Sequence, residues 1–288
     1  MDVRCLIVST FASKLLLAEL IEVAQISKNI FVGNCLPGAT GRIFGGQVAA
    51  QSLRSAILVR PDDRFIHSYS CIFLRPGIPE FQVRYVVNEL RNGKSLSTYR
   101  VDAYQDIKGE ESLIMTSTSS FHIEEESQSY QDQMPAVISA EECGLAGYIP
   151  PGSNSRVREP IDFRWPDGPP NSIVPSHPRQ LTWFKSGDLL PDDPQMHACA
   201  LTYITDLTLT RTAHMPLNNP QSRQLGSSLD HSMHFHRPFR VDEWVLFEQE
   251  AASYSGSRSI ASGKIFTKDG SLAVSVRQEA LIRCAEET

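Results

Sequence analysis

The chain repeats itself at a nearly constant spacing, and this internal repeat limits its fold more than any other feature. The sequence FLRP at Phe73–Pro76 recurs as FHRP at Phe235–Pro238, 162 positions later. Two further pairs of turn sequences keep nearly the same spacing: NGKS at 92–95 with SGSR at 255–258, and DIKG at 106–109 with TKDG at 267–270. Three matches at nearly one spacing indicate a duplicated domain of about 110 to 130 residues.

The region between the two copies differs from both of them. It contains the acidic run Glu124–Glu126, a stretch rich in Ser and Gln, and many prolines between Pro150 and Pro178. Such a segment is long for a loop inside one compact unit and is typical of a connection between units. We therefore expect an N-terminal unit at 1–122, a linker at 123–180 and a C-terminal unit at 181–288.

Each copy has the pattern of one helix followed by several strands. Apolar periodicity predicts helices over 47–59 and 196–211, and a shorter amphipathic helix over 13–26. Runs of β-branched and aromatic residues between turn residues predict strands over 66–74, 81–90, 96–105 and 112–122, and over 227–236, 244–254, 258–267 and 272–283. One helix wrapped by an antiparallel sheet, occurring twice, predicts an α+β double hotdog fold, in which such units pair through their sheets.

Composition restricts the partners and the compartment. The chain has 27 basic and 33 acidic residues and a net charge of −6, which disfavours nucleic acid and anionic membranes as partners. The six cysteines form no Cys-x-x-Cys pair, so we expect a reducing compartment, no disulfides and no structural zinc. Charged residues interrupt the apolar N-terminus, and Glu286-Glu287-Thr288 is no Ser-Lys-Leu address. The sequence predicts an intracellular location, cytoplasmic rather than peroxisomal.

Gln278 is the first candidate functional residue. Strand alternation places it on the face of Val274, Val276 and Ala280, where it is the one polar side chain of that strand face. A buried amide without hydrogen bonds costs about 1–3 kcal/mol, so Gln278 needs polar partners. A structural glutamine with satisfied hydrogen bonds explains this pattern equally well.

Asp206 is the second candidate. It is the single charged residue between Cys199 and Leu209, inside a predicted helix where Asp is a poor helix former. A carboxylate on the inner face of that helix would be a candidate general base. An aspartate facing solvent is the competing interpretation.

The third candidate region, Gly226–Pro238, holds three of the eight histidines. A serine-hydrolase elbow needs G-x-S-x-G, but Asp230 occupies the position of the second glycine. A metal site would use Asp230, His234 and His236, but nothing supplies the rest of the ligand shell, so we expect no metal. A polar strand face at an interface is the competing interpretation for these histidines.

Together these motifs resemble the type II acyl-CoA thioesterases, the family of bacterial thioesterase II and the eukaryotic peroxisomal acyl-CoA thioesterases. The resemblance runs from about Ile21 to Arg283. Its specific marks are GRIFGGQ at 41–47, the stretch 67–77, Thr205–Leu207, LDHSM at 229–233 with FHRPF at 235–239, and Gln278-Glu279.

The resemblance implies hydrolysis of acyl-CoA without a cofactor. The family's catalytic trio falls on Asp206, Ser228 and Gln278, which would hold a water that attacks the thioester carbonyl directly. The first half lacks this set: counting back 161 positions from Gln278 reaches Ser117, and the helix at 47–59 has no carboxylate. We therefore expect one catalytic set per chain, a scaffold role for the first half and, by family resemblance, association into a homo-oligomer.

The chain departs from the family pattern at His234, where a tryptophan is usual. His231 and His234 are therefore candidate substrate-binding residues, and a dedicated biosynthetic pathway with an unusual acyl thioester is a reasonable setting. Simple alternation places Ser228 on the strand face of His234, opposite Leu229 and Met233. The alternatives are a hotdog lyase or isomerase that uses these histidines as proton carriers, and a non-catalytic acyl-binding paralogue.

Overall fold

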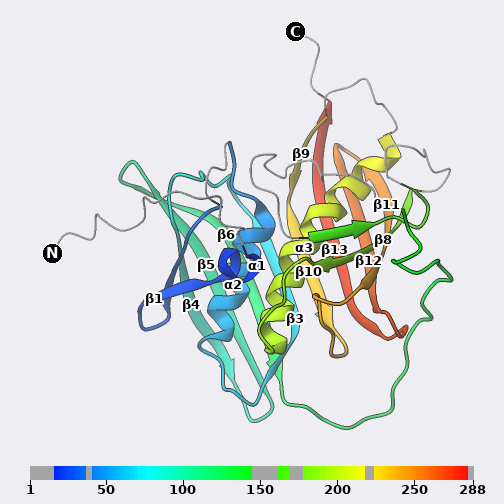
Figure 1. Cartoon of the computed structure of the whole chain (residues 1–288). Coiled ribbons are helices and arrows are strands. Elements are labelled where there is room, and N and C mark those ends of the chain that lie inside the picture. Colours follow the sequence, from blue (N-terminus) through cyan, green and yellow to red (C-terminus); the bar gives the residue numbers. More distant parts are fainter. Residues whose placement is uncertain (1–15, 37–40, 145–160, 169–177, 218–223, 285–288) are drawn as a thin grey trace, which may run out of the picture.

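Two helices, α2 (Gly45–Ile57) and α3 (Pro194–His214), pack against each other inside one long curved antiparallel sheet (Figure 1). This computed structural model describes residues 16–36, 41–144, 161–168, 178–217 and 224–284. A helix enclosed by an antiparallel sheet occurs once in each half of the chain. The α+β double hotdog prediction is therefore confirmed.

The strands and the shorter helices follow the chain in two blocks. The first block holds α1 (Leu17–Ile21), β1 (Val23–Ser27), β2 (Ile30–Gly33), β3 (Phe65–Phe73), β4 (Val83–Asn92), β5 (Leu96–Ile107) and β6 (Glu110–His122) around α2. The second block, around α3, holds β7 (Ile161–Arg164), β8 (Arg179–Ser186), the 3-10 turn η1 (Met215–Leu217), β9 (Gln224–Ser228), β10 (Asp230–Phe235), β11 (Val245–Ser255), β12 (Arg258–Thr267) and β13 (Leu272–Cys284).

The two halves join edge to edge in the middle of the sheet. The strand order is β1-β2-β4-β5-β6-β3-β10-β13-β12-β11-β8-β7, and β9 pairs with β13 beside this path. At the seam β3 and β10 run antiparallel, with Asp230 opposite Ile72 and His234 opposite Ser68 (Figure 1). A continuous ladder across the seam therefore joins the sheet of one half to the sheet of the other.

Both long helices were predicted to within three residues at each end, but two details of the sequence pattern were wrong. The predicted strand over 227–236 is divided at Leu229 into β9 and β10. The helix predicted over 13–26 ends at Ile21, and Val23–Ser27 instead pairs with β2 as an edge strand. Residues 13–15 lie outside the described part of the chain.

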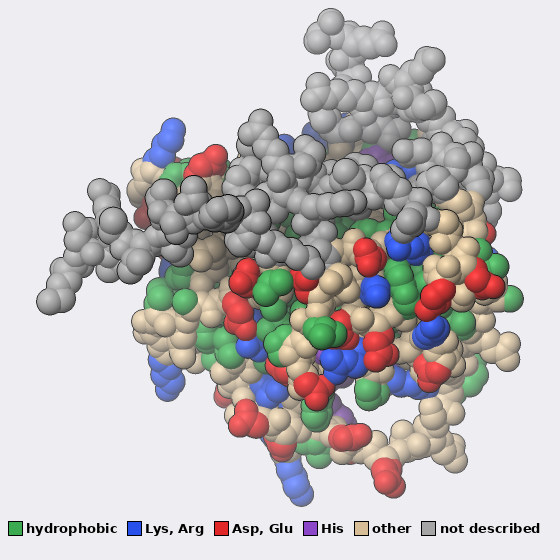
Figure 2. All heavy atoms as spheres, in the orientation of Figure 1, with side chains coloured by type: hydrophobic (Ala, Val, Ile, Leu, Met, Phe, Trp, Pro, Cys, Tyr) green, Lys and Arg blue, Asp and Glu red, His purple; other side chains and the backbone are tan. Residues whose placement is uncertain are grey.

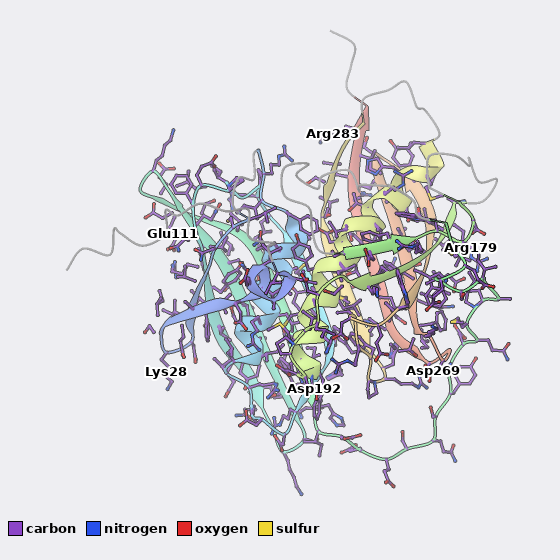
Figure 3. All side chains as sticks on the ribbon, viewed as in Figure 1. Lys28, Glu111, Arg179, Asp192, Asp269 and Arg283 are labelled. Atoms are coloured by element: carbon purple, nitrogen blue, oxygen red, sulfur yellow. The ribbon has the colours of Figure 1, made fainter. Side chains whose placement is uncertain are left out.

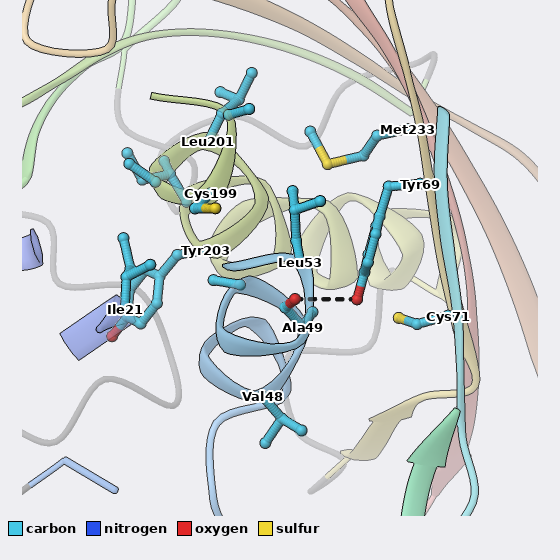
Figure 4. Close-up of a cluster of buried hydrophobic side chains, with 14 of the residues drawn as sticks. Ile21, Val48, Ala49, Leu53, Tyr69, Cys71, Cys199, Leu201, Tyr203 and Met233 are labelled. Carbon is cyan, nitrogen blue, oxygen red and sulfur yellow. Dashed lines mark hydrogen bonds between the residues drawn. The ribbon is translucent and has the colours of Figure 1, made fainter. Parts of the chain in front are cut away.

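The core between the helices depends on a close approach of α2 to α3 (Figure 4). A Cβ atom added to Gly46 would lie 2.8 Å from the carbonyl oxygen of Tyr203, so a side chain there would collide with the α3 backbone. Leu53 and Met233 fill the space between the helix pair and the sheet. This contact brings the N-terminus of α2 beside the middle of α3.

The segment from Met134 to Cys143 packs on the outer face of the second half of the sheet. Ala140 and Cys143 are buried against Trp183, Leu246 and Phe266. The predicted linker range 123–180 thus contains packed residues, the whole of β7 and the start of β8. The division of the chain at 122 and 180 stays a prediction.

The surface and the helices bear on possible partners. Acidic and basic side chains are interspersed over the described part of the face in Figure 2, with no broad area of one sign. Within the described residues, every helix is too short or too polar to cross a bilayer.

Candidate active site

The three residues predicted to form a catalytic set come together at one place. Asp206 lies in the middle of α3, Ser228 ends β9, and Gln278 lies in β13. The Nε2 amide of Gln278 donates to Oδ1 of Asp206 at 2.8 Å and to Oγ of Ser228 at 2.7 Å. The Ser228 hydroxyl donates to the same Oδ1 at 3.1 Å. A carboxylate, a hydroxyl and an amide thus share one hydrogen-bonded cluster.

Two of the three side chains in this cluster are shielded from water. Gln278 is fully buried and Asp206 is 5% exposed, whereas Ser228 is only half-buried. Burial strengthens hydrogen bonds to a carboxylate, because no water competes for its oxygens. The half-buried Ser228 marks the side from which a ligand can reach Asp206.

Ser228 reaches this cluster because the sheet has a bulge at Leu229. Ser228 lies opposite Ala280, and Met233 lies opposite Val276, so one strand advances by five residues while β13 covers four. The extra residue reverses the facing of the chain before it. Simple alternation predicts Ser228 on the face opposite Met233; that prediction was wrong, and Ser228 faces inward.

Thr210 is a fourth member that the sequence did not reveal. It follows Asp206 by one turn of α3, and its Oγ1 accepts from Nε2 of Gln278 at 2.8 Å and lies 3.4 Å from Oγ of Ser228. The i, i+4 spacing from Asp206 was the available signal, since such residues share a helix face. The Gln278 amide has two hydrogens for three oxygens, so one acceptor is always available for another donor, such as a water molecule.

His231 lies behind Gln278 and is fully buried. Its Nδ1 is 2.8 Å from Oε1 of Gln278, and its Nε2 is 3.0 Å from Oγ1 of Thr205. Burial lowers the pKa of His231, although the nearby Asp206 and Asp230 carboxylates act in the opposite direction. His231 therefore contacts a member of the trio and does not line the exposed side of the site.

His234 does not join the trio. It points from the opposite face of β10, where it is exposed and lies across from Ser68 in β3 and Ser275 in β13. The bulge explains this separation as well, because it places Ser228 on the inner face and leaves His234 on the outer one. Across the described ranges, no three His, Cys, Asp or Glu side chains are arranged as a metal site.

The N-terminus of α2 faces Asp206 from the first half of the chain. A Cβ atom on Gly45 would lie 3.2 Å from Oδ2 of Asp206 and 3.1 Å from Cε1 of Phe73. The residue before the helix, Phe44, provides no side-chain cap. The first N–H groups of an α-helix have no intrahelical acceptor, so this end is suited to binding an anionic oxygen.

Two family models match the chain, one in each half. The acyl-CoA thioesterase family matches residues 175–281, which include Asp206, Ser228 and Gln278. The acyl-CoA thioesterase N-terminal domain matches residues 36–122. The two matches correspond to the two repeats in the sequence.

Relatives and solved structures agree with these matches along the whole chain. Acyl-CoA thioesterase 2 of Haemophilus influenzae is 32% identical over 285 residues, covering 94% of this chain and 98% of its own. Human acyl-coenzyme A thioesterase 8 is 30% identical, with 93% and 89% covered. The crystal structure of acyl-CoA thioesterase II TesB2 from Mycobacterium marinum is 35% identical with a TM-score of 0.79, covering 94% of this chain and 99% of that one. The chain therefore belongs to the type II acyl-CoA thioesterase family.

Proposed function

We propose that this thioester hydrolase cleaves an acyl-CoA to the free acid and coenzyme A with a water molecule that Asp206, Ser228 and Gln278 hold and activate. The observation that carries the proposal is the shared contact at Oδ1 of Asp206, which accepts hydrogen bonds from both Gln278 and Ser228. The thioesterase relatives in bacteria and mammals support the reaction class. They also disfavour the lyase, isomerase and non-catalytic alternatives.

Asp206 is the proposed general base. Two donors fix its Oδ1, so its carboxylate cannot rotate freely, and its Oδ2 faces the N-terminus of α2 near Gly45. A base that is already oriented removes much of the entropic cost of proton transfer from water. The proton taken from water is the one that the departing thiolate of coenzyme A requires.

The N-terminus of α2 is the proposed site for the thioester carbonyl oxygen. Attack of water places negative charge on this oxygen, and the Gly45 and Gly46 N–H groups with the positive end of the helix dipole would stabilise it. The absence of a side-chain cap at Phe44 supports this role, because a cap would occupy the same N–H groups. The two halves would then supply different parts of one site.

Ser228 is proposed to orient water and not to form an acyl-enzyme. A serine nucleophile is ordinarily activated by an imidazole within hydrogen-bond reach. Here both ring nitrogens of His231 are engaged with Gln278 and Thr205, and the Ser228 hydroxyl donates to a carboxylate. The hydroxyl and the Gln278 amide would together fix the direction of the water lone pair.

A rapid-quench experiment tests this proposal. The enzyme is mixed with excess acyl-CoA, and coenzyme A release is followed from the first turnover alongside the intact protein mass. Direct attack by water predicts a linear release without a burst and no acyl mass on the protein. A burst of one coenzyme A per chain, with an acyl group on the peptide that contains Ser228, contradicts the proposal.

The proposal also covers the domain organisation, the compartment, the oligomeric state and the pathway. Family matches at 36–122 and 175–281 support two hotdog units joined by an intervening segment. The wide spacing of the six cysteines in the sequence, without a Cys-x-x-Cys pair, supports a reducing, cytoplasmic setting. Light scattering and a fluorescent fusion would test the homo-oligomer and the compartment, and a panel of unusual acyl-CoAs would test a specialised pathway.

A further inference from the structure

The orientation of the Gln278 amide is fixed by the chemistry around it. A carboxylate only accepts hydrogen bonds, so the NH₂ group of Gln278 must be the end that faces Asp206 at 2.8 Å. The oxygen end then faces Nδ1 of His231, also at 2.8 Å. Because an amide oxygen accepts only, Nδ1 of His231 must carry a hydrogen.

The other ring nitrogen of His231, Nε2, carries no hydrogen. Burial lowers the pKa of His231, so the ring is neutral near pH 7 and carries one N–H group. With that hydrogen on Nδ1, Nε2 is an acceptor, and the Thr205 hydroxyl 3.0 Å away must donate to it. Thr205 has a competing acceptor in the Thr202 carbonyl oxygen at 3.3 Å, which is the longer contact.

We propose that His231 is a positioning residue: the Thr205 hydroxyl selects its Nδ1–H tautomer, and this tautomer holds Gln278 with its NH₂ group toward Asp206 and Ser228. The inference rests on the proposed function, since it names what orients a member of the catalytic set. The donors run in one direction, from Thr205 to His231 to Gln278 to Asp206. Every donor in this row faces an acceptor.

Loss of the Nδ1–H donor would release the amide. A half-turn of the Gln278 amide would bring its oxygen against the Asp206 carboxylate, where two acceptors repel each other, and would remove the donor to Ser228. His231 is fully buried behind Gln278, so it does not reach a substrate on the Ser228 side. The expected defect is therefore in kcat, with KM preserved.

Two isosteric substitutions separate positioning from general stability. The side-chain amide of Asn overlays Nδ1 of histidine, whereas that of Gln overlays Nε2. His231→Asn therefore keeps a donor toward Gln278 and should retain most of kcat, whereas His231→Gln should lose about 100-fold, the effect of misplacing a catalytic group. His197 in α3 is the matched control. Like His231 it is buried, but its Nδ1 accepts a hydrogen bond from the Val241 N–H at 3.2 Å.

The tautomer itself gives a readout that does not depend on activity. In protein labelled with ¹⁵N-histidine, two-bond ¹⁵N–¹H correlations distinguish Nδ1–H from Nε2–H for His231. We expect Nδ1–H in the wild type, and a shift toward Nε2–H in Thr205→Val, which removes the donor to Nε2. His197→Asn should leave the His231 pattern and kcat unchanged.

The outcomes distinguish this inference from the proposed function. An Nε2–H tautomer in the wild type, or equal losses in His231→Asn and His231→Gln, overturns the positioning role while leaving the role of Asp206 intact. Full activity of Asp206→Asn overturns the proposed function, whatever the tautomer. A rise in KM with unchanged kcat in His231→Gln would make His231 a substrate contact and also overturn the inference.

Discussion

The two halves of the chain have the same backbone plan but different polar groups at matching positions. A bulge that occurs in both β6 and β13 shows which positions of the two halves correspond. In the first half the Leu74 N–H donates to the Ile114 carbonyl oxygen, and in the second the His236 N–H donates to that of Ala273. The strands shift register beside both acceptors. Ile114 and Ala273 are therefore equivalent, 159 positions apart.

This equivalence corrects one prediction from the sequence. The counterpart of Gln278 is Ser119, and not Ser117, which a spacing of 161 positions selects. Ser119 is fully buried, and among the described residues its hydroxyl has no hydrogen-bond partner. Ser117 instead pairs with Ser52 of α2, with 2.6 Å between the two Oγ atoms. The first half thus joins helix to sheet through small hydroxyls.

The counterpart of His231 is Tyr69, since both precede the FLRP or FHRP sequence by the same distance. The Tyr69 hydroxyl donates to the carbonyl oxygen of Ala49 in α2 at 3.1 Å (Figure 4). In the first half this position fastens the sheet to the helix backbone. In the second half it contacts the amide of Gln278, so one scaffold position serves packing in one copy and the proposed catalytic set in the other.

The helix N-termini differ in the same way. Asp193 caps α3 by accepting from the Gln195 N–H at 2.9 Å, and it lies 3.7 Å from Arg54 of α2. The adjacent Asp192, near the N-terminal end of α3 in Figure 3, pairs with Arg240 at 2.6 Å. The N-terminus of α2 has no such cap and faces Asp206. Of these two helices, α2 is therefore the one whose first N–H groups are left for a ligand.

The largest expected effect comes from making the second half resemble the first. Gln278→Ser introduces the residue of Ser119 and removes the donor to Asp206. Loss of one oriented donor in an active site lowers kcat by about 10²- to 10³-fold. Steady-state thiol release measures kcat, and Ser119→Ala, at the matching position of the first half, should leave kcat unchanged. Equal rates for Gln278→Ser and the wild type would contradict a functional difference between Gln278 and Ser119.

The next effect separates two adjacent glycines of α2. A Cβ on Gly45 would lie against Asp206 and Phe73, so Gly45→Ala should lower kcat about tenfold by displacing groups in the site. A Cβ on Gly46 would collide with Phe44 and the Tyr203 carbonyl, so Gly46→Ala should lower the free energy of unfolding by about 1–3 kcal/mol. Urea denaturation and kinetics on both variants check this, and a reversed pattern would place the site elsewhere.

A smaller effect concerns the pH dependence of stability. Burial lowers the pKa of His231 below the model-peptide value of 6.5, against the opposing charges of Asp206 and Asp230. The unfolded chain therefore binds a proton that the folded chain does not, and the free energy of unfolding falls as pH drops below about 6.5. This histidine contributes a slope of up to about 1.4 kcal/mol per pH unit.

His231→Asn removes that group, so its urea unfolding curves between about pH 7 and about pH 5 should show a shallower loss of stability. Tyr69→Phe, at the matching position, has no group that titrates in this range and serves as the control. An unchanged slope in His231→Asn would mean that His231 does not stay neutral when folded.

The smallest effect is at Ser119. Because its buried hydroxyl has no partner among the described residues, Ser119→Ala should raise the free energy of unfolding by about 1 kcal/mol. Ser117→Ala should lower it by a similar amount, since it breaks the pair with Ser52. Thermal denaturation compares the two, and a loss of stability in Ser119→Ala would show that its hydroxyl makes a stabilising hydrogen bond in the folded protein.

Much of the fold and the trio followed from sequence because both depend on local patterns. The repeated FLRP and FHRP sequences predicted two equivalent units, and the isolated polarity of Asp206 and Gln278 marked buried polar groups. The position of a bulge, in contrast, does not follow from the local sequence pattern. A single extra residue at Leu229 reverses which face Ser228 occupies, and counting by twos along a strand does not detect it.

The partners of Gln278 were missed for a related reason. Its bonds to Thr210 and His231 join α3, β10 and β13, and such contacts depend on how these elements pack together. The sequence does not set Thr210 apart from Thr202, because each lies four residues from Asp206 in α3. The same limit applies to Ser117 and Ser119. The β5–β6 hairpin is longer than the β12–β13 hairpin, so counting at one spacing selects the wrong serine.

The proposed role of Asp206 as general base is tested by measuring free-thiol release from acyl-CoA by Asp206→Asn. The assay uses short, medium, long and aromatic acyl-CoAs, and Ser52→Ala in α2 is the matched control from the first half. If Asp206 is the general base, Asp206→Asn should lose at least about 100-fold in rate while it unfolds like the wild type, and Ser52→Ala should stay close to the wild-type rate. Thiol release by Asp206→Asn at the wild-type rate would contradict a catalytic set in the second half.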